Sequence, residues 1–233
     1  MSASPGSRVV RVAIIDSGVH AEHPHVGGVS GGIGVDEHGQ LHDDYVDRLG
    51  HGTAVAAAIR EKAPHADLYA IKVFDRELAA TGRALVAACH HASTLNVDLV
   101  NMSLGTANAE HEPALSDAID RLRATGAVLI AAGMQDGVRW LPGSLTGAWQ
   151  VSLDWTLPRD RCRLERLNAS GAVFRASGYP RPIPGVAPER NLKGLSFAVA
   201  NVTGIVARLL VDADGGAAPA VQRAFERGGL FLG

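Results

Sequence analysis

The chain has 233 residues, of which 46% are hydrophobic and 20% are charged, and its formal net charge is -2. This balance is typical of one globular domain with a sizeable core. It includes neither the basic runs of a nucleic-acid-binding protein nor the ~18 consecutive apolar residues of a membrane span, so we expect no nucleic-acid partner and no membrane segment.

Short β-branched runs alternate with helical patterns along the chain. The expected strands lie at residues 9–15, 68–73, 98–103, 127–132 and 149–153, and the expected helices at residues 51–59, 82–94, 112–125, 196–210 and 219–226. Strands that alternate with helices predict an α/β fold of three layers, with a mostly parallel central sheet and helices on both faces. Ligands of such sheets bind beyond the carboxyl ends of the strands.

Two regions have weak patterns. The glycine-dense residues 27–34 predict a loop, and residues 159–190 predict irregular structure with edge strands. We expect a flexible N-terminus at residues 1–7 and a single domain at residues 8–233. The first residues have no signal-peptide pattern and Cys89 lies in an apolar helical pattern, so we expect a buried free thiol and a cytoplasmic protein.

The first motif places an acid directly after a buried strand. Residues 12–18 read VAIIDSG, and Asp16 therefore sits at the sheet edge where sites form. Taken alone, this pattern is weak, because an aspartate in this place can also bind a ribose, a metal ion or a helix N-terminus.

The second motif places a histidine between two glycines at the start of a helix. Residues 50–53 read GHGT, and the glycines let backbone approach the ring of His51 closely. The alternative is a surface histidine in a tight turn, since the chain has ten histidines.

The third motif places a serine at another helix start. Residues 194–198 read GLSFA, so Ser196 would lie near free backbone N–H groups and the positive end of the helix dipole. These features suit a nucleophile that generates an oxyanion. The alternative is a serine that only caps its helix.

The three motifs occur in the chain order Asp, His, Ser, and together they resemble the subtilase family. The resemblance extends to residues 68–73 (LYAIKV), 100–105 (VNMSLG) and 131–133 (AAG), and covers roughly residues 8–210. It is weakest between residues 154 and 193. It implies a subtilisin-like fold and a serine protease with no cofactor.

The resemblance also implies a role for each matched residue. Ser196 would attack a peptide carbonyl, His51 would transfer its proton, and Asp16 would orient the imidazole. Ser103, Leu104 and Gly105 resemble the edge that pairs with substrate backbone, Ala131, Ala132 and Gly133 resemble a wall of the first specificity pocket, and residues 80–82 are a candidate second edge strand.

The chain departs from the family pattern at the oxyanion position. Met134 stands where the family usually has an asparagine that donates a hydrogen bond to the oxyanion, and methionine has no such donor. The neighbouring Gln135 carries an amide. Two alternatives are therefore open: catalysis is slow for lack of the donor, or Gln135 supplies the donor.

We expect no metal site. The segment after the histidine helix is too short for the calcium loop of many secreted relatives. Asp43, Asp44 and Asp47 are interpreted as a solvated acidic loop rather than as metal ligands.

Three functions compete. The leading hypothesis is a serine endopeptidase for limited intracellular processing of a peptide or precursor, with a possible partner protein in a peptide-maturation pathway. The second is a pseudoprotease that binds a peptide in the same groove. The third, a dinucleotide-binding oxidoreductase, fails because no G-x-G-x-x-G follows the first strand.

Overall fold

The computed structural model describes residues 8–74, 80–228 and 231–232. Within these residues ten strands form one sheet, in the order β12-β10-β11-β9-β6-β5-β1-β4-β2-β3. The strands are listed here in chain order: β1 (Arg11–Asp16), β2 (Gly31–Val35), β3 (Leu41–His42), β4 (Asp67–Lys72), β5 (Leu99–Met102), β6 (Val128–Ala132), β9 (Trp149–Leu153), β10 (Cys162–Asn168), β11 (Gly171–Ala176) and β12 (Phe231–Leu232).

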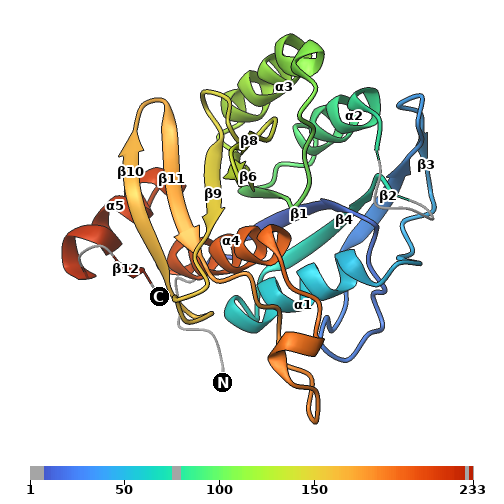
Figure 1. Cartoon of the computed structure of the whole chain (residues 1–233). Helices are drawn as coiled ribbons and strands as arrows, with labels where there is room; N and C mark the ends of the chain where they lie inside the picture. The colour runs from blue at the N-terminus through green and yellow to red at the C-terminus, as the bar shows by residue number, and fades with distance from the viewer. Residues whose placement is uncertain (1–7, 75–79, 229–230, 233) are drawn as a thin grey trace.

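Helices cover both faces of this sheet (Figure 1). They are α1 (His51–Lys62), α2 (Gly82–Ala92), α3 (Glu112–Ala124), α4 (Leu195–Val211) and α5 (Ala217–Gly228). Helices α1 and α4 pack against each other on one face, and α2 and α3 pack against each other on the opposite face. The predicted three-layer α/β architecture is confirmed.

The central strand β1 contributes to both hydrophobic cores because successive side chains of a strand point to opposite faces. Val12 and Ile14 join the core under α1 and α4, while Ala13 and Ile15 join the core under α2 and α3. β1 pairs in parallel with β4 on one side and β5 on the other. Its last residue, Asp16, therefore lies in the middle of the carboxyl edge.

The prediction of a loop at residues 27–34 is wrong for residues 31–34, which belong to a strand. Strand β2 begins at Gly31 and pairs in parallel with β4. Its glycines leave room for neighbouring rings, since a Cβ on Gly32 would lie 2.5 Å from Cγ of Tyr45, and one on Gly34 would lie 1.9 Å from the ring of His42. The glycines of β2 thus reflect packing inside a strand.

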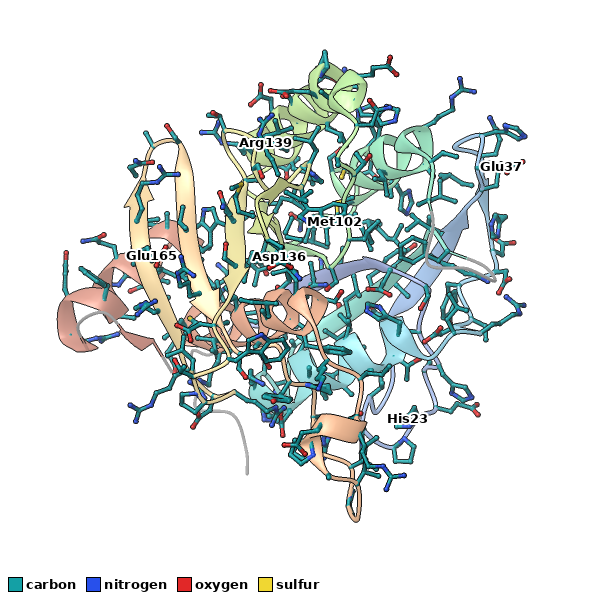
Figure 2. All side chains as sticks on the ribbon, viewed as in Figure 1. His23, Glu37, Met102, Asp136, Arg139 and Glu165 are labelled. Atoms are coloured by element: carbon teal, nitrogen blue, oxygen red, sulfur yellow. The ribbon has the colours of Figure 1, made fainter. Side chains whose placement is uncertain are left out.

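Residues 159–190 are more regular than predicted. β10 and β11 form an antiparallel hairpin, and β11 lies inside the sheet, where it pairs in parallel with β9. Outward charged side chains interrupt the apolar pattern, and one pair, Arg175 and Glu165, forms an ion pair of 2.6 Å between the two strands. Figure 2 shows Glu165 on this hairpin.

Two sequence predictions concern smaller features. Cys89 is a buried free thiol, as predicted, and Cys162 is another. The N-terminal segment at residues 1–7 lies outside the described residues.

Candidate active site

Asp16 is fully buried at the end of β1. Its Oδ1 accepts a hydrogen bond of 2.7 Å from the backbone N–H of Ser17 and lies 2.7 Å from Nδ1 of His51. Its Oδ2 has no hydrogen-bond partner among the described residues. The bond from the Ser17 N–H and the position of Asp16 at the end of β1 thus orient the carboxylate toward the imidazole.

His51 is the first residue of α1, after Gly50 in the left-handed conformation with φ 81°. Because a carboxylate only accepts, Nδ1 carries the proton of this bond, and Nε2 is left to act as a base. Burial by itself lowers the pKa of His51. The hydrogen bond to Asp16, the charge of Asp16 and the charge of Asp47 outweigh that effect, so the pKa is raised above 6.5.

Ser196 is the second residue of α4, at a helix N-terminus whose first N–H groups have no partner within the helix. Its Oγ donates a hydrogen bond of 2.9 Å to the carbonyl of Ser103. Within the described residues, Ser196 makes no hydrogen bond to His51. Phe197, the next residue of α4, lies with its ring centroid 5.6 Å from that of His51.

Several of the candidate residues line one cavity of about 520 Å³. His51 and Ser196 both line it. So do four of the residues that the sequence assigns to substrate binding, which are Ser103, Leu104, Gly105 and Ala132.

Two further predicted wall residues lie outside this lining. Ala131 faces the core under α2 and α3. Gly133 lies against Gln150, whose Cγ would be 1.9 Å from a Cβ at this position. Of the AAG segment, only Ala132 lines the cavity: Ala131 points to the opposite face of β6, and Gly133 follows the end of that strand.

The oxyanion candidates follow β6 in a small hairpin, β7 (Met134–Gln135) and β8 (Val138–Arg139). Strand alternation separates the two side chains. Gln135 lines the cavity, whereas Met134 is not among the lining residues and is 45% exposed. Figure 2 labels Asp136 and Arg139 on this hairpin; Asp136 also lines the cavity.

A second hollow of about 760 Å³ lies beside this cavity. Ala80 and Thr106 line both hollows, which are therefore neighbours and are together called the cleft. Figure 2 shows Glu37, which lines the far part of this cleft, at the turn between β2 and β3. Residues 80–82 form no strand, since Thr81 caps α2 by accepting a hydrogen bond from Ala84 N–H; they do border the cleft.

The acidic loop differs from its prediction at one position. Asp47 is 9% exposed and bound by hydrogen bonds, rather than solvated. The reason is that its carboxylate accepts the free N–H groups at the start of α1, where an acid also meets the positive end of the helix dipole. Sequence reasoning missed this residue and its partner Ser17, although the spacing of an acid before a helix start was a usable signal.

Among residues 8–74, 80–228 and 231–232, no group of three or more His, Cys, Asp or Glu side chains is placed to hold a metal ion. Within the same residues, no helix combines the length and apolarity that a bilayer span requires.

Comparison with known proteins identifies the family of the chain. The model of the subtilase family matches residues 7–145, and the chain belongs to that family. Subtilisin DY of Bacillus licheniformis is 34% identical over 137 residues, which are 55% of this chain and 48% of that protein. The chain thus spans about half the length, or less, of the curated relatives it matches.

Solved structures show the same fold. A lanthipeptide protease superposes with a TM-score of 0.70 at 17% identity, over 93% of this chain and 79% of that one. A prenylagaramide maturation protease superposes with a TM-score of 0.62 at 24% identity, over 86% of this chain and 74% of that one. The fold is therefore subtilisin-like.

Proposed function

We propose that the chain is a serine endopeptidase whose catalytic triad is Asp16, His51 and Ser196. The observation that carries this proposal is the 2.7 Å bond between Asp16 and Nδ1 of His51, beside a cavity that His51 shares with Ser196. A buried carboxylate that orients an imidazole next to a serine is the arrangement that activates the hydroxyl for acyl transfer.

The reaction follows from these positions. The Ser196 hydroxyl first turns from Ser103 toward Nε2 of His51, and its oxygen then bonds to the peptide carbonyl carbon while the proton passes to Nε2. His51 returns that proton to the leaving amine as the C–N bond breaks. Water then attacks the acyl group with His51 again as the base, which releases the carboxylic acid and restores Ser196.

The N–H groups at the start of α4 would stabilise the negative oxygen of each tetrahedral intermediate. The amide of Gln135, which lines the same cavity, is the candidate second donor. No step of this chemistry calls for a cofactor.

The shape of the cleft favours an extended peptide as substrate. Residues 103–105 follow β5 outside any described strand, so their backbone can pair with a peptide in the manner of an added strand. The second hollow of the cleft provides space beyond the residues next to the cleaved bond.

Two structural neighbours are named as a lanthipeptide protease and a prenylagaramide maturation protease. By analogy we propose limited processing of a peptide or precursor, with a partner protein of a maturation pathway as a possible aid to substrate delivery. The buried free thiols fit a cytoplasmic setting, where cysteines stay reduced.

A second function, peptide binding without cleavage, is favoured by one observation. The Ser196 hydroxyl is bonded to the Ser103 carbonyl rather than to His51. A domain that kept this arrangement with a peptide bound would hold its ligand intact.

A peptide library tests the proposal. Wild type should cleave a subset of peptides, and Ser196→Ala should cleave none while still binding them. If the folded wild type binds peptides in the cleft and returns all of them intact, the second function is the correct one.

A further inference from the structure

Asp47 is a second buried carboxylate close to the candidate triad. It lies in the loop before α1, and its two oxygens accept five hydrogen bonds of 2.6–2.9 Å. The donors are the backbone N–H groups of Leu49, Gly50 and Thr53 and the hydroxyls of Thr53 and Ser17. A charge buried with this many donors is held firmly, because each charge-assisted bond is stronger than a neutral one.

These bonds join the two segments that carry the Asp16–His51 pair. Ser17 donates its hydroxyl to Asp47 at 2.9 Å and accepts the N–H of Gly52 at 2.9 Å. The N–H of Ser17 meanwhile donates to Asp16. Asp47 is therefore connected through one serine to the residue that follows His51 and to the carboxylate that His51 contacts.

A second connection runs through Thr53. Its hydroxyl donates to Asp47 at 2.6 Å and accepts the backbone N–H of His20 at 3.0 Å. The segment after β1 is thus bonded at two places to the first turn of α1, and Asp47 takes part in both.

The contact between these segments leaves no space for adjustment. A Cβ on Gly52 would lie 2.1 Å from the carbonyl oxygen of Gly18, and one on Gly18 would lie 2.3 Å from that of Tyr45. Backbone packs on backbone here, so the position of the His51 ring depends on the bonds that hold the segments in register.

We propose that Asp47 is a positioning residue for His51 that holds its ring against Asp16 through the bonds of Ser17 and Thr53. Its charge also stabilises the protonated ring. Asp47 is not a member of the triad, and an acid that only capped α1 would not be needed to keep the His51 ring against Asp16. The effect on the ring stands on the structure alone, and its consequence for turnover rests on the proposed peptidase function.

The charged groups around His51 determine the pKa that a titration of its ring would measure. Asp16 approaches from β1, Asp47 from the loop before α1, and Asp136 from the hairpin on the other side of the cavity. Helix α4 presents Ser196 and Phe197, which carry no charge at neutral pH. Among these acids, Asp16 and Asp47 raise the pKa of His51 against the lowering effect of its burial.

The test compares Asp47→Asn with Asp44→Asn as a matched control. Asp44 lies in the same loop and pairs with Arg48 and Lys72, away from α1. The readout is NMR of the His51 ring, assigned among the ten histidines by its loss in His51→Gln. Asp47→Asn should lower the pKa of His51, and Asp44→Asn should leave it unchanged.

The kinetic readout separates positioning from substrate binding. With a cleaved peptide, Asp47→Asn should lower kcat by about tenfold or more, since displacement of a catalytic group is strongly felt in the rate, while KM stays within about twofold. The NMR result does not depend on turnover, so an inactive wild type would refute the peptidase proposal without touching this one.

A folded Asp47→Asn protein with the wild-type pKa of His51 overturns the proposal and leaves Asp47 as a helix cap. If Asp47→Asn does not fold, Ser17→Ala decides, because it keeps both carboxylates and removes the hydroxyl that joins Asp47 to the N–H of Gly52, the residue after His51. Weakening of the downfield Nδ1 proton signal of His51 in Ser17→Ala supports the proposal, and an unchanged signal overturns it.

Discussion

Ser103 and Ser196 exchange hydrogen bonds: the Ser196 hydroxyl donates to the Ser103 carbonyl at 2.9 Å, and the Ser103 hydroxyl donates to the Ser196 carbonyl at 3.0 Å. The side chain of Asn101 donates to the same Ser103 hydroxyl at 2.9 Å. This arrangement fixes the start of α4 to the end of β5, and it places the candidate nucleophile beside the edge where a peptide would pair.

Ser103→Ala should therefore reduce stability. The fully buried amide N–H of Asn101 would be left without this acceptor, and an unsatisfied buried donor costs about 1–3 kcal/mol. Urea unfolding of wild type and variant measures the loss, with the exposed Ser170→Ala as the control. An equal loss in both variants, or none in Ser103→Ala, would contradict the role of this bond.

Gln135 and Met134 are the two candidates for the position that donates a hydrogen bond to the oxyanion, and each leads to a different prediction. Because Gln135 lines the cavity and Met134 does not, we expect Gln135→Ala to lower kcat with little change in KM. The loss should approach ~10²–10³, the range known for removal of one such donor from a subtilisin. If Met134 instead occupies the position of the family's oxyanion donor, Met134→Asn should raise kcat.

Steady-state kinetics of both variants decide between these possibilities. Unchanged kinetics of Gln135→Ala, together with a faster Met134→Asn, would show that the family position at Met134 is the one that matters. Met134→Ala is the matched control for loss of a side chain on the opposite face of the hairpin.

Gly52→Ala should disrupt the site at its most crowded point. The added methyl would lie 2.1 Å from the Gly18 carbonyl and 3.2 Å from Oδ1 of Asp16, so β1 and α1 must separate. We expect a melting temperature lower by several degrees and loss of peptidase activity. Gly216→Ala, where an added Cβ meets nothing within 4 Å, is the control. Wild-type activity in Gly52→Ala would refute the close contact.

The sequence could predict the site residues that lie at the end of a strand or the start of a helix. Asp16 follows a buried strand, while His51 and Ser196 begin helices, and in a parallel sheet all three meet at the carboxyl edge. The end of the strand and the starts of the two helices could be predicted because strand patterns and helix starts are local properties of the chain.

The missed features depend on contacts between distant segments. The glycines of β2 were interpreted as a loop because their neighbours, Tyr45 and His42, come later in the chain. Asp47 was interpreted as solvated because its burial requires Ser17 and the turn of α1. The separation of Gln135 from Met134 depends on a hairpin of two-residue strands that carries no periodic signal.

The raised pKa of His51 predicts opposite pH effects on stability and activity. The folded protein favours the protonated ring, so this contribution to the free energy of unfolding is fully present below the unfolded pKa of 6.5 and is lost as the pH rises through the higher folded pKa. Activity needs the neutral ring and should rise through that same folded pKa.

Urea unfolding at about pH 5.5 and about pH 8.5, for wild type and His51→Gln, isolates the stability effect. The advantage of wild type over the variant should be larger at the lower pH. An advantage that grows with pH would show that burial, rather than the two carboxylates, dominates the pKa of His51.

The most direct test of the central claim is labelling of Ser196 by a fluorophosphonate, which reacts with activated serines and needs no knowledge of the substrate. Intact-mass measurement should show one adduct on wild type and none on Ser196→Ala, with labelling slowed strongly in His51→Ala because the base is lost. Folded wild type that takes up no label, or labels as fast without His51, would contradict a catalytic triad of Asp16, His51 and Ser196.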